Sequence, residues 1–348
     1  MPEALNTEDR TTPGLVCAHH HLYSALARGM PAPPSTPRDF TQILEQVWWR
    51  LDLALDLELV RWSALLGAVE ALEAGTTAIV DHHASPAAID GSLDVIAEAC
   101  AEVGVRVVCA YEVTDRHGPA GAKAGLAENE RFLRAGGRGL VGAHACLTLS
   151  DATLDAVVGL AADLGAGVHI HVGEDHTDAA ATERLRPHAT DDWLLAHCVH
   201  VDPPIAGTIA HNPRSNLNNG VGYARPARWQ AAGNRVVLGS DGIGAAMVDE
   251  AALAFVAHRA DDVTATPDEA WSWLAAGADL VPEVRGDEVT WRADRVDPWY
   301  LAYTPGVRAE RVVVDGETVV EGGRCTRVDS ERIRARAWEE ARRLWSAL

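Results

Sequence analysis

Lysine is almost absent from this sequence, since Lys123 is the only one among 348 residues. Arginine therefore supplies nearly all of the positive charge. Asp and Glu outnumber Lys and Arg by 50 to 30, which gives a formal net charge of −20. A surface of this sign does not attract a phosphate backbone or an anionic membrane. We therefore expect no nucleic-acid partner and no membrane attachment through a basic face.

Long apolar runs, a secretory signal and a disulfide framework are also missing. No uninterrupted apolar stretch approaches the roughly 18 residues of a membrane-spanning helix. The opening segment 1–14 has neither the basic nor the apolar region of a signal peptide. The six cysteines are scattered without a Cys-x-x-Cys pair, which is typical of buried thiols in a reducing compartment. These absences predict a cytoplasmic protein.

The composition is that of a folded globular chain, with 47% hydrophobic and 23% charged residues. Its length suits one large domain or two ordinary ones. Eight short apolar segments rich in β-formers occur at 14–21, 76–83, 105–113, 139–147, 167–174, 193–201, 207–213 and 235–242. Helical segments such as 92–104 and 151–165 stand between most of them, with apolar residues at i, i+3 and i+4 and a glycine at the end.

Eight strands that alternate with helices predict an α/β fold, and specifically a (β/α)8 TIM barrel. An open doubly wound sheet is the structural alternative. Histidines and acids stand at the carboxyl ends of most of the predicted strands, where a barrel gathers its active site on one face. An open sheet would spread the same residues along about 35 Å, at about 4.8 Å per strand. The distribution of polar residues therefore favours the barrel.

After residue 265 the pattern changes. A helix is predicted at about 267–278, a hairpin over 310–323 with Asp-Gly at its turn, and an amphipathic helix over about 329–347. We predict a barrel over 13–280, followed over 281–348 by a truncated small β domain consisting of a hairpin and a C-terminal helix. The proline-rich segment 30–38 is either a lid over the site or a plain connector.

Histidines recur with a spacing that suits metal binding. The side chains of residues i and i+2 of a strand point to the same side, so His19 and His21 can bind one ion together. His169 and His171 repeat the spacing, and the eighth strand ends in Asp241. Taken singly, each of these histidines could instead be a hydrogen-bonded residue of the core, and Asp241 could be a turn residue. We keep this structural interpretation for the histidines outside the pattern: His82, His188, His200 and His258.

Taken together, the histidines that end the first, fifth and sixth strands would meet Asp241 at one mouth of the barrel. Three imidazoles and one carboxylate suit a single divalent zinc or iron ion with an open position for water. Other polar residues at the strand ends are candidates to line the pocket or to support it from behind: Tyr23, Arg28, His82, His83 and Glu112.

The order of the motifs resembles a known family. Between Pro13 and Asp249 the chain reads PGLVCAHHHLYSALARGM, TTAIVDHHAS, GAHACLTLS, HIHVGE, LLAHCVH, AHNPRSNLNNG and GSDG. This series is similar to the amidohydrolase superfamily, in its branch of mononuclear aminohydrolases that deaminate purines, pyrimidines, triazines and adenosine-like nucleosides. HHHLYSALARGM and DHHAS also resemble the aminohydrolase/chlorohydrolase-like subgroup called SsnA, and 8-oxoguanine and isocytosine deaminases.

The resemblance implies roles for the matching positions. Glu174 would be the proton shuttle, and His197 would orient and help activate the metal-bound water. His144 would contact the substrate, and Ser215 and Asn216 would help shape the pocket. The ligands of the metal would be His19, His21, His171 and Asp241.

These roles predict an enzyme, a hydrolytic deaminase of an amino-substituted, nucleobase-like heterocycle. Metal-bound hydroxide would attack the ring carbon that bears the amino group, with Asp241 taking the proton of the water. Glu174 would protonate the neighbouring ring nitrogen, and ammonia would leave. Two alternatives remain: a dechlorinase or amide-type hydrolase with the same site, and a non-catalytic metal-binding homologue. Glu174 favours an amino leaving group, because ammonia needs a proton to leave and chloride does not.

Metal number and subunit number are further expectations. Binuclear members of the superfamily commonly bridge two metals with a carboxylated lysine near the fourth strand, and Lys123 lies outside that predicted strand. We therefore expect one divalent ion, with zinc as the first choice and iron as the alternative. Relatives build a small β-sandwich from both termini. The roughly 13 residues before the first strand are too few for its N-terminal half. Either the C-terminal remnant packs alone against the barrel or a partner subunit covers the exposed surface, and of these we favour a homodimer.

Overall fold

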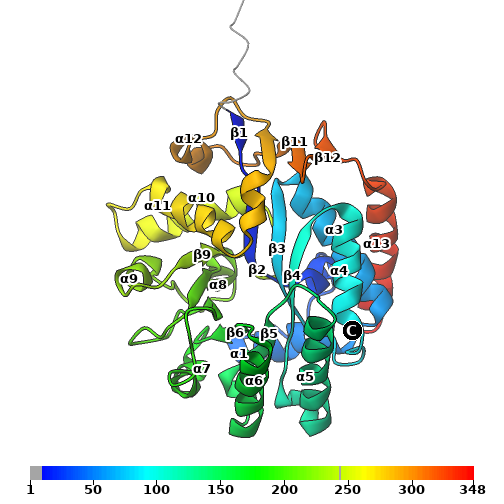
Figure 1. The fold of residues 1–348 in the computed structure, drawn as a ribbon, viewed down its shortest axis with the longest axis vertical. Helices are drawn as coiled ribbons and strands as arrows, with labels where there is room; N and C mark the ends of the chain where they lie inside the picture. The colour runs from blue at the N-terminus through cyan, green and yellow to red at the C-terminus, as the bar shows by residue number, and fades with distance from the viewer. Residues whose placement is uncertain (1–9, 243) are drawn as a thin grey trace, which may run out of the picture.

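The computed structural model describes residues 10–242 and 244–348 (Figure 1). Residues 1–9, for which the sequence predicts no secretory signal, lie outside the described residues. Eight parallel strands form the centre of the molecule: β2 (Leu15–His20), β3 (Thr76–His83), β4 (Arg106–Tyr111), β5 (Val141–Ala145), β6 (Val168–Val172), β7 (Leu194–His197), β8 (Thr208–His211) and β9 (Val236–Leu238). Each lies within one of the eight segments predicted from the sequence.

The eight strands close into a ring. β2, β3 and β4 form one parallel sheet, and β5 to β9 form another in sequence order. Isolated parallel bridges join the two sheets on both sides. Cys109 with Gly139 and Val113 with Ala143 link the β4 and β5 segments, and His20 with Asp241 links β2 to the residues after β9. This closed order is that of the predicted TIM barrel.

Helices surround the ring and connect its strands. They are α1 (Phe40–Ile43), α2 (Trp49–Leu53), α3 (Leu57–Glu73), α4 (Ser92–Val103), α5 (Gly118–Arg134), α6 (Asp151–Leu164), α7 (His176–Thr182), α8 (Pro213–Asn218), α9 (Pro226–Ala231), α10 (Met247–Asp261), α11 (Pro267–Ala275), α12 (Pro298–Tyr303) and α13 (Ser330–Trp345). Within the described ranges, no helix combines the length and the apolar character needed to cross a bilayer. All six cysteines are buried free thiols.

The strands are apolar on both faces because both faces are buried. One face packs on the helices, and the other fills the interior of the barrel. Val16 and Ala18 of β2 point inward, where they belong to a core with Val80 that Val281 and Val284 also join. This packed core lies below the mouth of the barrel, and it leaves the carboxyl ends of the strands for polar side chains.

A local irregularity in β2 changes which of its residues face inward. Simple alternation from Val16 and Ala18 would point His20 into the barrel. The pairing of β2 with β3 shifts between Cys17 and His20, and such a shift re-aims the following side chains. As a result His19 and His21 face the mouth of the barrel, while Nδ1 of His20 bonds to Oγ of Ser240 at 3.1 Å.

A small antiparallel sheet lies at one end of the molecule, at the top of Figure 1. Its strand order is β1 (Thr11–Thr12), β10 (Glu288–Trp291), β11 (Ala309–Val314), β12 (Glu317–Glu321) and β13 (Arg324–Cys325). The predicted hairpin corresponds to β11 and β12. Three further strands extend it, including one from before the first barrel strand, because an isolated two-stranded hairpin buries too little surface to be stable in water. The final helix α13 packs on α3.

Candidate metal and active site

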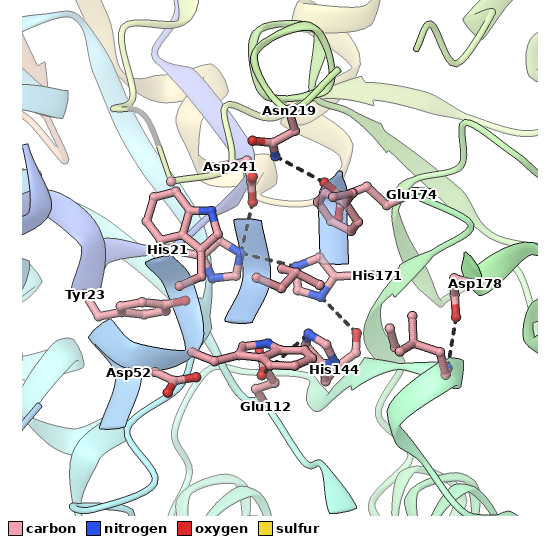
Figure 2. Close-up of a pocket in the computed structure, with 17 residues that line it drawn as sticks. His21, Tyr23, Asp52, Glu112, His144, His171, Glu174, Asp178, Asn219 and Asp241 are labelled. Atoms are coloured by element: carbon pink, nitrogen blue, oxygen red, sulfur yellow. Dashed lines mark hydrogen bonds and ion pairs between the residues drawn. The ribbon is translucent and has the colours of Figure 1, made fainter. Parts of the chain in front are cut away.

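Four side chains converge at the mouth of the barrel, where one ligand atom of each lies within 4.8 Å of the others: His19, His21, His171 and Asp241. Oδ1 of Asp241 lies 3.1 Å from Nε2 of His19 and 2.9 Å from Nε2 of His21. Nε2 of His21 lies 3.2 Å from Nε2 of His171. Figure 2 shows His21, His171 and Asp241 pointing toward one another, from positions at or just after the ends of different strands.

The opposite ring nitrogens of these histidines are held by protein groups. Nδ1 of His21 donates to the carbonyl oxygen of His82 at 2.5 Å, and Nδ1 of His171 donates to that of His144 at 2.8 Å. A carbonyl oxygen only accepts, so both Nε2 atoms carry lone pairs in the neutral rings. Nδ1 of His19 bonds to Nε2 of His169 at 2.8 Å in the same way. Such outer hydrogen bonds orient histidines for metal binding.

The donor set fits one divalent ion. Lone pairs and a carboxylate that face a common centre repel one another unless a cation lies among them. Imidazole nitrogens with one carboxylate oxygen are ligands that zinc and ferrous iron accept, with a position left open for water. The four residues could therefore hold such an ion.

A second group meets the same distance criterion: His82, Glu112 and His171. It shares His171 with the first group, and its carboxylate is already paired, since Arg116 donates to Oε1 of Glu112 at 2.5 Å. The first group is therefore the better metal site.

The backbone at this site is unusual. His197 has a φ of 70° and Asp241 a φ of 59°, in a left-handed region that costs a non-glycine residue about 1 to 3 kcal/mol. Gly239, two residues before Asp241, is tightly packed, since a Cβ there would lie 2.4 Å from Oδ1 of Asn212 and 2.8 Å from Cβ of His19. The β9 strand ends at Leu238, and this tight turn carries Asp241 over the mouth.

Asp241 is ionised in this setting. Burial alone would raise the pKa of its carboxyl, but its close contacts with His19 and His21 hold that pKa well below its usual range. Its second oxygen, Oδ2, accepts a hydrogen bond from Oγ of Ser215 at 2.6 Å. Both oxygens are thus oriented, with Oδ1 toward the cluster.

Glu174 and His197 lie beside the cluster. Oε2 of Glu174 is 3.4 Å from Nε2 of His197, and Nδ2 of Asn219 donates to Oε1 of Glu174 at 3.4 Å (Figure 2). Burial, reinforced by the nearby charge of Asp241, raises the pKa of the Glu174 carboxyl well above its usual range. A carboxyl with a raised pKa can hold a proton at neutral pH and donate it.

The tautomer of His197 follows from its neighbour Asn216. Nδ1 of His197 donates to Oδ1 of Asn216 at 2.8 Å, so Nε2 carries the lone pair. That Nε2 is buried and has no hydrogen-bond partner, and burial also lowers the pKa of the ring. A neutral histidine with a free acceptor beside the cluster can receive a hydrogen bond from a water molecule there.

The predicted substrate contacts fall into two groups. His144 lines the cavity at the site, as do Tyr23 and Glu112. Among the described residues, four other candidates do not line it: His82, His83, Ser215 and Asn216. Their side chains bond to protein groups behind the lining, as shown by His83, whose Nε2 bonds to Oγ of Ser85 at 2.8 Å. Arg28 pairs with Glu70 at 2.5 Å, outside this cavity.

The sequence does not reveal the wall opposite the cluster. The cavity at the site is open to solvent and is bounded on that side by Phe40, Leu44, Trp48, Trp49 and Asp52. These residues belong to α1, the π-helical turn Leu44–Trp48 and α2, which follow the proline-rich segment 30–38. The adjacent tryptophans after that segment are the one sequence signal that could have indicated this wall.

The sequence is similar to proteins of known type along nearly its whole length. Residues 10–276 match the family model described as the amidohydrolase family. The chain is 30% identical to a 5-methylthioadenosine/S-adenosylhomocysteine deaminase from Desulforudis audaxviator, over 98% of this chain and 89% of that protein. It is 28% identical to a 5′-deoxyadenosine deaminase from Methanopyrus kandleri, over 99% and 88%.

Solved structures show the same fold. An adenosine deaminase from Xanthomonas campestris with bound zinc has a TM-score of 0.83 at 20% identity, and the match covers 97% of this chain and 86% of that one. A mutant atrazine chlorohydrolase from Arthrobacter aurescens, in complex with zinc and atraton, has a TM-score of 0.82 at 24% identity, with coverage of 95% and 88%. The predicted TIM barrel is confirmed.

Proposed function

This chain belongs to the amidohydrolase family, and we propose that it is a metal-dependent deaminase that hydrolyses a C–N bond of an amino-substituted, nucleoside-like heterocycle. One observation carries the proposal: a buried carboxyl with a raised pKa, Glu174, stands beside a three-histidine, one-aspartate cluster. The two relatives described above are named as deaminases of adenosine-type compounds, and this supports the substrate class.

We assign the residues as follows. A divalent ion held by the cluster would lower the pKa of water toward about 7, which makes hydroxide available at neutral pH. Asp241 takes the proton of the attacking water, and Nε2 of His197 accepts a hydrogen bond that orients it. Glu174 protonates the ring nitrogen next to the carbon under attack. The water oxygen bonds to that carbon. The proton held by Asp241 then passes to the amino group, which leaves as ammonia as the C–N bond breaks. The remaining hydroxyl proton returns to Glu174, so that a carbonyl group is left on the ring.

The predicted substrate contacts that lie behind the cavity lining have a different role in this proposal, because they position the residues at the site. Ser215 holds Asp241 and Asn216 holds His197, while the carbonyl oxygen of His82 orients His21. His144 and the aromatic wall contact the substrate. The ammonia-releasing reaction is preferred to dechlorination because an amino group needs a proton to leave, and two carboxyl groups that can carry protons, Glu174 and Asp241, lie at the site, whereas chloride leaves without a proton. It is preferred to a non-catalytic role because the ligands and the proton shuttle are all present.

Zinc is the metal we propose, because imidazole nitrogens with one carboxylate are typical zinc ligands.

We also propose a homodimer, a cytoplasmic location, and a division into a catalytic unit at 13–280 and a small unit at 281–348. Exposed aromatic side chains, Trp299 and Tyr303 on α12, support self-association. Light scattering of the purified protein would test it, and a monomer at micromolar concentration would contradict it.

Ammonia release tests the function. The zinc-loaded protein is incubated with 5-methylthioadenosine and with 5′-deoxyadenosine, the compounds in the names of the two relatives. We expect ammonia in step with the absorbance change of the purine, and none with Glu174→Gln. If no amino-heterocycle releases ammonia while a chlorinated ring releases chloride, the dechlorinase alternative replaces this proposal.

A further inference from the structure

The cavity at the mouth of the barrel is lined by acids. Of the 17 described residues that line it, five carry a carboxylate, namely Asp52, Glu112, Glu174, Asp178 and Asp241, and none is a lysine or an arginine. Two of the three lining histidines, His21 and His171, belong to the metal cluster. The ion proposed there lies at the end where the ring reacts, with the carboxylate of Asp241 and the carboxyl group of Glu174 beside it. The rest of the cavity has no cation of its own to offer a substrate.

A guanidinium does lie close behind this lining, but it is occupied. Arg116 donates from one terminal nitrogen to Oε1 of Glu112 at 2.5 Å and from the other to Oδ2 of Asp52 at 3.2 Å. Its Nε donates to Oγ1 of Thr114 at 3.3 Å. Its guanidinium carbon lies 4.7 Å from the ring centroid of Trp49. All three nitrogens thus bond to the protein, and no free fork remains for a substrate carboxylate.

Asp52 lines the cavity, and one of its two carboxyl oxygens has no hydrogen-bond partner among the described residues. Its side chain is 2% exposed, and while Oδ2 pairs with Arg116, Oδ1 is buried without a hydrogen-bond partner. A buried acceptor is satisfied by a donor on the ligand, whereas a ligand carboxylate would set acceptor against acceptor. Figure 2 shows Asp52 and Glu112 together on the side of the cavity away from Asn219.

A cavity lined in this way should discriminate between substrates by the charge of the 5′ substituent. The name of one relative joins 5-methylthioadenosine, whose 5′ substituent is an uncharged thioether, with S-adenosylhomocysteine, whose 5′ substituent ends in an amino acid that carries both an ammonium and a carboxylate group. We propose that this chain accepts adenosine-type substrates with a neutral or cationic 5′ substituent and excludes those with an anionic one. The inference rests on the proposed function. With the amino group at Glu174, the 5′ substituent faces the remaining described walls of the cavity, none of which carries a lysine or an arginine.

Three nucleosides of similar size provide the test: 5′-deoxyadenosine, 5′-amino-5′-deoxyadenosine and adenosine 5′-carboxylate. Burial raises the pKa of Asp52 to about 7 while Arg116 opposes the shift, so the assay is run at pH 8, where this carboxyl is mostly ionised. We expect kcat/KM for the carboxylate to be on the order of 100-fold below that of the neutral compound, as for like charges a few ångströms apart in a partly buried site. The amine should react at least as well as the neutral compound.

Two substitutions connect the discrimination to the cavity. Asp52→Asn removes the unpaired carboxylate and should reduce the ratio of neutral to anionic kcat/KM about tenfold. Asp56→Asn is the matched control, because Asp56 lies four residues further on, outside the cavity lining, and pairs with Arg343. A purely structural role of Asp52 would lower both rates and leave the ratio unchanged, which would contradict the proposal.

A second variant does not depend on a buried position. Leu147 lines the cavity and is 40% exposed, so Leu147→Arg can be accommodated and supplies the missing cation. It should raise kcat/KM for the carboxylate at least tenfold, whereas Val263→Arg, at a position 75% exposed and outside the cavity lining, should not.

The results of these assays distinguish a failure of the charge selection from a failure of the proposed deaminase function. If all three nucleosides react equally well, the deaminase function stands and the charge selection alone is overturned. If none of them reacts with the zinc-loaded protein, or shifts its melting temperature, the proposed substrate class fails and the selection fails with it. If only the neutral and cationic compounds react, both are supported.

Discussion

Nε2 of His21 and Nε2 of His171 lie 3.2 Å apart, although each ring donates its Nδ1 proton to a backbone carbonyl oxygen. Two lone pairs therefore face each other at contact distance, and a cation between them removes the repulsion. We expect one divalent ion per chain by elemental analysis. Its removal with a chelator should lower the melting temperature by on the order of 5 °C, because the ligand-free site loses the binding free energy.

Replacing both histidines, His21→Ala with His171→Ala, should bring the metal content close to zero. His200→Ala is the matched control, since Nε2 of His200 bonds to the carbonyl oxygen of Val221, outside the cluster. A content of two ions per chain in the unaltered protein would contradict the single-ion proposal, and would direct attention to the group that includes His82 and Glu112.

Glu174→Gln tests the proton shuttle. The amide keeps the shape of the side chain but cannot protonate a ring nitrogen, so kcat should fall by about 100- to 10,000-fold while the metal content stays unchanged. Glu183→Gln, on an exposed side chain paired with Arg186, should leave both quantities unaltered. If the activity of Glu174→Gln stayed within a few-fold of that of the unaltered enzyme, Glu174 would not be the proton shuttle.

Asn216→Ala tests the orientation of His197. Without the Oδ1 acceptor at 2.8 Å, Nδ1 no longer holds the proton preferentially, and the ring presents the wrong tautomer for part of the time. We expect kcat to fall about 10- to 100-fold, as is usual for such supporting residues, with little change in KM. Asn218→Ala, on the exposed side of the same helix, is the control, and an equal loss in the two variants would indicate helix damage instead.

Gly239→Ala tests the tight turn that carries Asp241. A methyl group would lie 2.4 Å from Oδ1 of Asn212 and 2.8 Å from Cβ of His19, so we expect a loss of about 1 to 3 kcal/mol in the free energy of unfolding and weaker metal binding. Gly159→Ala lies within α6 with open space around it, and there alanine should stabilise by about 0.5 to 1 kcal/mol. Denaturant melts of the two variants give the comparison.

The barrel strands were predictable because their chemistry is local. Each is a short run of apolar residues, and in the fold each is buried on both faces, so composition alone marks it. The predicted segments extend beyond the observed ends of the strands, and the residues that follow those ends include members of the candidate site. Glu174 follows β6, which ends at Val172, and Asp241 follows β9, which ends at Leu238. Strand geometry stops at these points because the backbone turns into the left-handed region, at Gly173 with a φ of 50° and at Asp241.

The supporting residues were harder to assign. A motif places Ser215 and Asn216 near the site, but only the three-dimensional arrangement shows that one bonds to Asp241 and the other to His197. The aromatic wall, with Trp48 and Trp49, has no periodic pattern that relates it to strand ends that lie far away in sequence, such as Glu112 and Asp241.

The sequence by itself determined which elements form and which residue types are available at the strand ends, because burial and propensity act over a few neighbouring residues. It also determined that lysine is scarce and that acidic residues outnumber basic ones by 50 to 30. Only the tertiary structure decided which of those residues meet. Closure of the ring brings His19 beside Asp241 across 222 positions of the chain, and the shift in β2 pairing turns His19 rather than His20 inward. It also places Arg116 against Asp52 and Glu112, because the pairing of charges depends on distances in space that local sequence does not encode.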